Sequence, residues 1–589
     1  MYGKAVLWGR LFCLFNKPCP VGGLLAEMLR PSLFKAVAMR LFISISLMAV
    51  VAGSAAAAAP SDISPSIDTM KEVVKEISSD AYEGRAPGTA GEEKTLSYLV
   101  RRFEAIGLKP GNKGSWFQDV PLVEIAAKNV SPLRFTGGKG PVSADYGSQM
   151  VIATYRTAAP HIEVKDSPVV FVGYGIKAPE KKWNDYAGAD VRGKTVIILV
   201  NDPDYQSPSL SGPFNGRAMT YYGRWTYKFE EAARQGAAAA IIVHDTMPAA
   251  YGWNVVQSSW TGAQHVADSA DGNAKQSAAI GWMQKDKAAA LMASAGLNLN
   301  RLSAAAKKRG FKAVPLKGIK ANVSFDNAIR KHMSKNLVAL LPGKTRPDEY
   351  VLYAAHWDHL GRCEAAPDGD DICNGAIDNA TGTAALVALA EANVKAGPSA
   401  RSQVFLAVTA EESGLLGSAY YGDHPVFPLK QTVGGVNMDA LSMAGLAKNV
   451  VVIGKGKSQL DAYLDRALAA QKRVASLEPT PEKGFYYRSD HFSFAKHGVP
   501  MLYFEGGQDL AKGGIEAGAA AAKDYEDHRY HSPKDEYDPK WDWSGVKADL
   551  KLYYEVGRAL ANTTEWPNWM AGDEFRAIRD ESRASHQHH

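Results

Sequence analysis

Short, almost continuous apolar runs alternate with amphipathic stretches throughout residues 322–575. Short apolar runs between turn signals predict buried strands, whereas apolar positions three and four residues apart predict helices. The predicted strands are 350–355, 403–408, 433–437 and 499–504, and the predicted helices are 383–393, 459–471 and 546–561. Buried strands joined by helical crossovers are typical of an α/β fold with a mostly parallel central sheet and helices on both faces.

Two more helices are predicted before this region. Residues 67–77 have helical apolar spacing, and Thr89-Ala90-Gly91-Glu92 has the sequence of a capping box that opens a second helix, which Gly107 ends. We assign these helices to the same α/β domain. Its predicted parts are an N-terminal part at 60–125, a main part at 322–575 and a C-terminal tail at 576–589.

The segment between these parts, residues 126–321, has a different pattern. Strands are predicted at 168–176, 195–200 and 237–243, with a helix at 227–235 that stops at a glycine. This part of the sequence contains no constellation of metal-type ligands. It is predicted to be a separate, small β-rich or α/β unit inserted into the larger domain.

The N-terminus has the three-part layout of a secretory signal. Arg40 precedes an apolar run over 41–53, and small residues at 54–59 follow it. A membrane anchor is the competing interpretation, but the run is short for a bilayer span and the small residues are typical of a cleavage site. We therefore expect residues 1–59 to be a leader with a signal peptide, the mature chain to start near Pro60, and the protein to be periplasmic or secreted without a stable membrane anchor.

The formal net charge of the 589-residue chain is +5. The predicted leader carries six basic residues and one acidic residue, so its removal leaves a mature chain that is close to neutral. Such a chain has no overall electrostatic attraction for nucleic acid or acidic membranes. The content of 46% hydrophobic residues is ordinary for a folded protein of several domains.

Cys363 and Cys373 are the two cysteines that remain after the leader is removed. In an exported protein, two cysteines a short loop apart are most simply a disulfide. Two free thiols are the alternative. A zinc site at this pair is disfavoured, because the loop lacks C-x-x-C spacing and carboxylate ligands are abundant nearby.

Metal-type side chains stand at or just beyond the ends of predicted strands. The candidate segments are His356-Trp357-Asp358, Asp378-Asn379, Glu411-Glu412, Asp439 and Tyr530-His531-Ser532-Pro533, and each supplies one metal-type ligand. In largely parallel sheets, ligands gather outside the carboxyl ends of the strands, so we expect these side chains to meet in one crevice. Two histidines and three carboxylates suit a pair of zinc ions, and two further carboxyls remain for orientation and proton transfer. Of the adjacent Glu411 and Glu412, one can bind zinc while the other moves a proton. The chain is therefore predicted to be a hydrolase.

Each segment alone has a simpler interpretation. Asp378 could cap the helix that follows it, and the Glu411-Glu412 pair could cap another. His359 is interpreted as a structural histidine. Ser489-Asp490-His491 invites a serine-triad interpretation, which is disfavoured because contiguous residues cannot generally point at each other and no nucleophile elbow is present.

These segments resemble the zinc-dependent M28 peptidase family. The matching motifs are Ala355-His356-Trp357-Asp358-His359-Leu360-Gly361, Asp378-Asn379-Ala380-Thr381-Gly382, Thr409-Ala410-Glu411-Glu412-Ser413-Gly414, Asn437-Met438-Asp439, Ser489-Asp490-His491 and Tyr530-His531-Ser532-Pro533-Lys534-Asp535. The resemblance implies a zinc-exopeptidase-like fold and two Zn²⁺ ions. It implies the following roles: His356 and Asp439 for one ion, Glu412 and His531 for the other, Asp378 as the bridge, Glu411 as general base and Asp358 as the residue that orients His356. It also implies a cis peptide bond after Asp378.

Residues 126–321 in turn resemble a protease-associated (PA) domain. The matching motifs are Val172-Gly173-Tyr174-Gly175-Ile176, Asp185-Tyr186-Ala187-Gly188, Gly193-Lys194-Thr195-Val196 and Gly236-Ala237-Ala238-Ala239. Such domains are usually non-catalytic inserts that shape or cover an active site. The resemblance therefore implies a peptidase domain interrupted by a PA domain.

Together these observations predict an exported di-zinc metallo-aminopeptidase that acts on peptides with a free N-terminus, with Glu411 as the general base. A carboxypeptidase of the glutamate type would need a cationic cluster for the substrate carboxylate, and Arg488 alone is a sparse signal for one. A glutaminyl cyclase would use one zinc ion. A non-catalytic binding protein on this fold would have no reason to retain both the metal ligands and the base.

Overall fold

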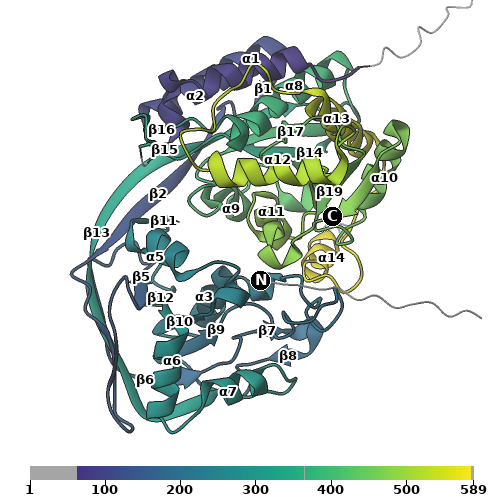
Figure 1. The fold of residues 1–589 in the computed structure, drawn as a ribbon. Helices are drawn as coiled ribbons and strands as arrows, with labels where there is room; N and C mark the ends of the chain where they lie inside the picture. Colours follow the sequence, from purple (N-terminus) through teal and green to yellow (C-terminus); the bar gives the residue numbers. More distant parts are fainter. Residues whose placement is uncertain (1–62, 364, 585–589) are drawn as a thin grey trace, which may run out of the picture. The chain divides into compact units, whose positions relative to one another are not determined.

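The computed structural model of the chain describes residues 63–363 and 365–584 (Figure 1). The predicted signal peptide and residues 585–589 lie outside the described residues. No helix within the described ranges is both long and apolar enough to cross a bilayer. The predicted α/β fold with a mostly parallel central sheet is confirmed.

The first sheet contains the predicted strands of the second half of the chain. Its strands, in spatial order, are β13 (Val314–Leu341), β17 (Arg401–Val408), β14 (Arg346–His356), β18 (Thr432–Asn437), β21 (Met501–Gly506), β19 (Asn449–Ile453) and β20 (Val474–Leu477). The central strands β17, β14, β18 and β21 are parallel, and the strands at the two edges run antiparallel to them. The carboxyl ends of the four central strands therefore share one edge of the sheet.

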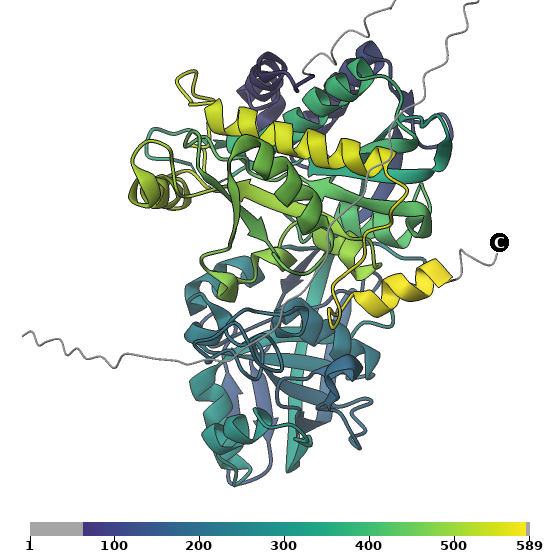
Figure 2. The same ribbon diagram turned by 90° about the vertical axis from the view of Figure 1, so that its right-hand side faces the viewer.

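Helices cover both faces of this sheet (Figures 1 and 2). One face carries α1 (Ile67–Ile77), α2 (Ala90–Ile106), α8 (Thr381–Lys395), α10 (Leu460–Gln471) and α13 (Ser544–Asn562), and the other carries α9 (Leu416–Asp423) and α11 (His491–Lys496). The alanines of α8 are fully buried, because this helix lies against β14 and also contacts α1, α2 and α13. Small side chains on α8 allow these neighbours to approach closely.

The start of α2 differs from the predicted capping box. Thr89 is the N-cap residue, but its hydroxyl donates to Ala86 O at 2.7 Å instead of accepting an amide of the helix. Glu92 turns into the core, where it is 4% exposed and accepts from Gly88 N at 2.6 Å and Ser334 Oγ at 2.8 Å. The predicted start of the helix at Thr89 and its end at Gly107 are confirmed, but the capping-box bonds are absent, because Glu92 contacts Ser334 on β13 instead.

The residues between β2 (Phe117–Lys128) and β13 form a second sheet. Its strands, in spatial order, are β5 (Met150–Ala153), β12 (Ala279–Gln284), β10 (Ala239–His244), β9 (Thr195–Leu199), β6 (His161–Phe171), β13, β3 (Leu133–Thr136) and β4 (Val142–Ala144). Its helices include α3 (Trp225–Arg234), α5 (Trp253–Thr261), α6 (Lys285–Ser294) and α7 (Leu299–Ala306). Apolar side chains of this segment form two clusters that are distinct from the core of the first sheet.

The long strand β13 takes part in both sheets (Figure 1). Its first half pairs with β6, its last residues pair with β17, and β2 runs antiparallel beside its middle. The predicted domain boundaries after residues 125 and 321 fall inside β2 and β13. The division into domains stays a prediction.

Two helices near the C-terminus were not predicted. α12 (Gly514–His528) is rich in alanine and mostly exposed, so it lacks an apolar stripe. α14 (Arg576–Ala584) lies in the stretch that was predicted to be a tail. It is docked, because Arg579 is 1% exposed and donates to Thr432 O and Val433 O at 3.0 and 2.9 Å.

Candidate metal centre

The predicted ligands come from neighbouring strand ends of the first sheet and from two turns. His356 is the last residue of β14, Glu411-Glu412 follows β17, and Asp439 follows β18. Asp378 lies in the turn before α8, and His531 lies in the turn after α12. The structure brings all five predicted ligands, together with Glu411, to one place at the carboxyl edge of the sheet.

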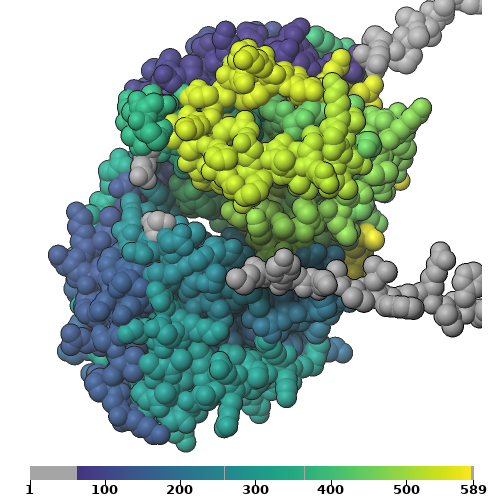
Figure 3. Space-filling model, viewed as in Figure 1, coloured from purple at the N-terminus to yellow at the C-terminus, as the bar shows by residue number. Residues whose placement is uncertain are grey.

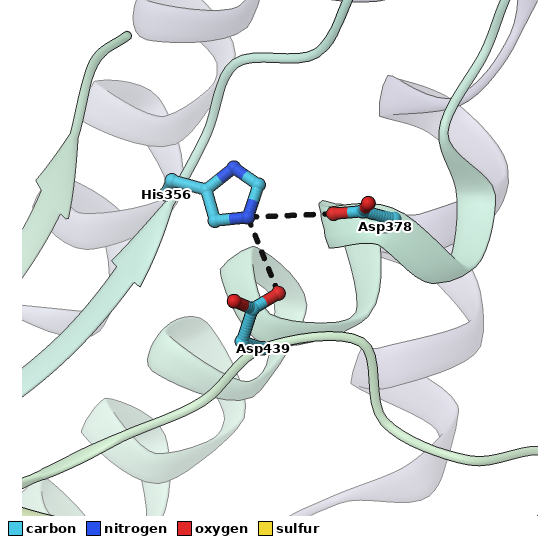
Figure 4. Close-up of side chains that lie close together, drawn as sticks. All are labelled: His356, Asp378 and Asp439. Atoms are coloured by element: carbon cyan, nitrogen blue, oxygen red, sulfur yellow. Dashed lines mark hydrogen bonds and ion pairs between the residues drawn. The ribbon is translucent and has the colours of Figure 1, made fainter. Parts of the chain in front are cut away.

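His356 is the centre of the first group of ligand atoms (Figure 4). Its Nε2 lies 3.4 Å from Asp378 Oδ1 and 3.3 Å from Asp439 Oδ1. The imidazole is 1% exposed, because it stands at the end of a strand that is covered on both faces. Ligand atoms of these three residues all lie within 4.8 Å of one another, so one metal ion could contact all three.

His531 is the centre of the second group. Its Nε2 lies 3.3 Å from Asp378 Oδ2 and 3.1 Å from Glu412 Oε2. The imidazole is 35% exposed and stacks on the ring of Tyr530. The two oxygens of Asp378 therefore face different histidines, which is the arrangement that a carboxylate shared by two ions requires.

His359 is a second candidate for the ion of this group. One ligand atom from each of His359, Asp378 and Glu412 also lies within 4.8 Å of the others. However, His359 Nδ1 is only 2.6 Å from Glu412 Oε1, which is a hydrogen-bond distance and is too short for two ligands of one ion. We therefore favour His531 as the ligand and His359 as the residue that holds the other oxygen of Glu412.

The spacing and the charge of the cluster fit two zinc ions. Ligand atoms about 2.0–2.1 Å from a zinc ion lie about 3.3–3.4 Å apart in a tetrahedron, and the four N–O separations here are 3.1, 3.3, 3.3 and 3.4 Å. Burial raises the pKa of Glu411 well above its usual range, and the charges of Asp439 and Glu412 add to this effect. Two divalent cations would offset the repulsion among these carboxylates.

Hydrogen bonds on both sides of Asp378 fix the turn that carries it. The carboxylate of Asp535 accepts from Ile377 N at 3.0 Å and from Asp378 N at 3.0 Å. The peptide bond between Asp378 and Asn379 is cis, as the family resemblance implied. Asn379 Nδ2 donates to Met438 O at 3.0 Å, and Asn379 Oδ1 accepts from Ala440 N at 3.1 Å, so this turn is tied to the segment that carries Asp439.

Ser489 holds the free oxygen of Asp439. Its hydroxyl donates to Asp439 Oδ2 at 2.7 Å and accepts from Asn437 Nδ2 at 2.8 Å. The amide of Asn437 thus directs the serine proton toward the carboxylate. Sequence reasoning did not find this role, because the contact spans 50 residues.

Asp358 contacts two of the other predicted residues. Its Oδ1 lies 3.8 Å from His356 Nδ1 and accepts from Glu411 N at 3.2 Å, while His356 Nδ1 lies 3.1 Å from the carbonyl oxygen of Asp358. Burial raises the pKa of the Asp358 carboxyl to about 8. Asp358 therefore lies where it can influence both the ring of His356 and the backbone at Glu411.

The segment Ser489-Asp490-His491 does not form a serine triad. The Ser489 hydroxyl is engaged by Asp439, and the His491 ring packs between Tyr486 and Tyr503. Burial lowers the pKa of His491 to about 3, so the ring is neutral at physiological pH. These contacts are those of a core histidine and not of a general base.

The predicted disulfide is present between Cys363 and Cys373. It closes the loop that carries the short strands β15 (Gly361–Arg362) and β16 (Ile372–Cys373), between His356 and Asp378. The loop beside the ligand cluster is therefore covalently closed.

A cavity of about 1190 Å³ opens beside the ligands. Its lining includes Asp378, Glu411 and Asp439 of the ligand cluster, and Tyr251 and Trp260 from the segment that forms the second sheet. Figure 3 shows one face of the molecule on which the segment of the second sheet, in blue to teal, adjoins the C-terminal third of the chain, in green to yellow. The volume is sufficient for a short peptide.

Comparison with known proteins gives a family match for part of the chain. Residues 336–554 match the model of Peptidase family M28. The curated relatives include "Aminopeptidase NAALADL1" of Mus musculus and of Rattus norvegicus, each 30% identical over 128 residues. These alignments cover 21% of this chain and 16% of each relative, so the chain spans about a sixth of the length of the relatives it matches.

The solved structures that match this chain are more distant in sequence. An aminopeptidase from Aneurinibacillus sp. strain AM-1 is 20% identical, with a TM-score of 0.45 over 85% of this chain and 95% of that chain. BSAP, a zinc aminopeptidase from Bacillus subtilis, is 17% identical, with a TM-score of 0.40 over 87% of this chain and 100% of that chain.

Proposed function

Because residues 336–554 belong to peptidase family M28, we propose that the whole chain is an exported di-zinc aminopeptidase. The observation that carries the proposal is the position of Asp378, whose two oxygens face the Nε2 atoms of His356 and His531 at 3.4 and 3.3 Å. A carboxylate placed in this way between two histidines can contact two metal ions. Capping of α8 would not require its two oxygens to face two different histidines.

Each ion would be held by a different pair of residues. His356 and Asp439 would hold one ion, Glu412 and His531 would hold the other, and Asp378 would contact both. When bound, the two zinc ions polarise the scissile carbonyl and lower the pKa of the attacking water. The imidazole and carboxylate donors match the preference of zinc.

Glu411 is the residue of this chain that moves the proton. Its Oε2 lies 3.9 Å from His356 Nε2, and its side chain is 11% exposed at the wall of the cavity. In this role Glu411 accepts a proton from the attacking water and then donates it to the leaving amine.

The substrate would be a peptide with a free N-terminus. The cavity has carboxylates at the end nearest the ligands, and Glu505 lies there as well. Negative charge at this end is complementary to an ammonium group. The insert, which we propose to be a PA domain, lines the cavity with Tyr251 and Trp260 and would thereby restrict the substrates that can enter.

Zinc content and turnover of matched peptides test this proposal. The mature protein should hold two zinc ions per chain, cleave aminoacyl substrates with a free amine, lose this activity to a chelator and regain it with zinc. N-acetylation of the same substrates should abolish cleavage. A protein with one zinc ion that cyclises N-terminal glutamine would be a glutaminyl cyclase, and a metal-loaded protein without any turnover would be a binding protein.

Export is proposed on the sequence of the leader alone. If the full chain is produced in a bacterial host, the protein recovered outside the cytoplasm should begin near Pro60 when its N-terminus is sequenced. Recovery of the intact N-terminus in the membrane fraction would instead indicate an anchor.

One observation favours a carboxypeptidase as the second candidate. Arg224 of the insert and Arg488 both line the cavity, and within the described residues neither guanidinium has a carboxylate partner. Burial lowers the pKa of Arg224 to about 10, and the charge of Arg488 contributes to the shift. Two unpaired guanidinium groups suit a substrate carboxylate. Cleavage of N-acetylated peptides that have a free C-terminal carboxylate, but not of their amides, would support this candidate over an aminopeptidase.

A further inference from the structure

We propose that Arg85 is a positioning residue of the metal centre, which sets the distance between the segment that carries His356 and the turn that carries Asp378. The inference rests on the proposed function, since it concerns the binding of the two ions. Arg85 lies outside residues 336–554, the part that matches the family model. Its loop could be interpreted from the sequence as a plain connector.

The hydrogen bonds of the Arg85 guanidinium join the two ligand-bearing segments. Nε donates to Trp357 O at 3.0 Å, next to His356 in sequence. On the other side, Nη1 donates to Asn374 O at 2.6 Å and Nη2 donates to Gly375 O at 2.9 Å, just before the turn that carries Asp378. The side chain is therefore a direct bridge between the backbones that present two ligands.

A further bond connects this bridge to the N-terminal helices. Nη1 also donates to Ile77 O at 2.8 Å, at the last residue of α1. The carbonyl oxygen of Arg85 accepts from His359 N at 3.4 Å. Arg85 is 0% exposed, so each of these bonds is shielded from water.

The backbone next to Arg85 lies close to the disulfide-closed loop that carries Gly361 and Cys373. Gly84 has φ +64°, and a Cβ atom there would lie 2.5 Å from Cys373 O and 2.6 Å from Gly361 O. Arg85 itself has φ +54°, a region that non-glycine residues rarely adopt. Arg85 therefore has an uncommon backbone conformation, and this conformation directs its side chain between the two segments.

The guanidinium of Arg85 donates to backbone carbonyls, and no carboxylate of the described residues forms a salt bridge with it. The four hydrogen bonds of its guanidinium described above all end on backbone carbonyls, although Asp358, Asp378 and Asp535 lie close enough to interact with its charge. A planar fork can reach several carbonyls at once, which a single lysine ammonium cannot do in the same geometry. The carboxylates therefore remain available for metal, while a fixed positive charge stands behind them.

The deciding measurement is metal affinity in the Arg85→Gly variant. Glycine tolerates the positive φ at this position, so the substitution removes the guanidinium without adding backbone strain. We expect zinc affinity, measured by chelator competition, to fall about 10- to 100-fold, the range for supports of metal ligands. The visible absorption of the cobalt-substituted protein should also change, and millimolar guanidinium ion, but not urea, should restore both properties.

Arg579→Gly is the matched control. Arg579 is also buried and donates to two backbone carbonyls, but these belong to Thr432 and Val433 at the start of β18, at the end of the strand away from the ligands. This variant should lose thermal stability and retain zinc affinity and the cobalt spectrum.

The inference would be overturned if Arg85→Gly behaved like Arg579→Gly, with a lower melting temperature and unchanged zinc affinity and cobalt spectrum. If Arg85→Gly does not fold, Arg85→Lys decides the matter, because it keeps the charge and the aliphatic stem; unchanged zinc affinity in this variant would also refute the proposed role. The wild-type protein is measured first, so failure to bind two zinc ions there would count against the proposed function and not against Arg85 alone.

Discussion

The two histidines of the candidate centre are placed by very different means. His356 is the last residue of a central strand and is 1% exposed, whereas His531 follows a mostly exposed helix and its side chain is 35% exposed. The partner of His356 is also supported, since Ser489 and Asn437 hold the free oxygen of Asp439. The difference indicates a rigid side and an adaptable side of one centre, and we expect the ion on the rigid side to bind more tightly.

The largest effect is expected on kcat, when Glu411 is replaced. Glu411→Gln should lower kcat by about 10²- to 10⁴-fold, the usual range for loss of a general acid or base, and should retain near-normal zinc content. Glu412→Ala should lose metal as well as activity. Steady-state kinetics combined with metal analysis of both variants checks this, and equal zinc loss in the two would refute their division of roles.

The next-largest effect is expected on zinc content, and it distinguishes His531 from His359. His531→Ala should lower zinc content from two ions to one per chain, because only one side of the centre loses its imidazole. His359→Ala is the control, since His359 would only hold Glu412. Metal analysis after gel filtration distinguishes the two, and loss of an ion in His359→Ala with two ions retained in His531→Ala would exchange their roles.

A smaller effect is expected on the rigid side. Ser489→Ala removes the donor to Asp439 Oδ2 and should weaken the binding of one ion by about tenfold, while the ion on the His531 side is retained. Ser489→Thr keeps a hydroxyl and serves as the matched control. Two-step chelator titration would reveal the change, and identical titrations for wild type and Ser489→Ala would show that the rigid side does not depend on this bond.

The smallest effect is expected on KM, and it concerns Glu505, which is not a candidate metal ligand. This carboxyl accepts from Tyr503 Oη at 2.9 Å, and burial raises its pKa to about 7. It is therefore neutral below that pH and charged above it, so KM for substrates with a free amine should fall severalfold as the pH rises through 7. Glu505→Gln should flatten this dependence; a steep pH dependence of KM in the variant would assign it to another group.

Much of the candidate site could be predicted because its members stand beside regular elements. The strands β14, β17 and β18 are nearly continuous apolar runs, so the polar residues that follow them were conspicuous. The cysteine pair was predicted from its spacing and the leader. Three residues escaped this reasoning. Ser489 and Arg85 act through contacts distant in sequence, and His359 could not be distinguished from a structural histidine without the position of Glu412.

Some parts of the fold were not predicted because their sequence pattern is weak. α12 lacks an apolar stripe, and buried and exposed residues do not alternate regularly along β13. Thr89 and Glu92 have the sequence of a capping box, yet Ser334 on β13 engages Glu92. At Glu92 a long-range contact outweighs a local preference.

The order of strands and helices, the class of the fold and the set of metal-type ligands are properties of local pattern, because burial imposes a period on the residues that form each element. Which oxygen of Asp378 faces which histidine is not encoded in that way. It depends on how β14, β18 and the turn after α12 are packed, and on side chains such as Arg85 and Ser489 that bridge segments far apart along the chain. Distances of 3 to 4 Å between such segments are set by packing and hydrogen bonding in three dimensions, which local periodicity does not specify.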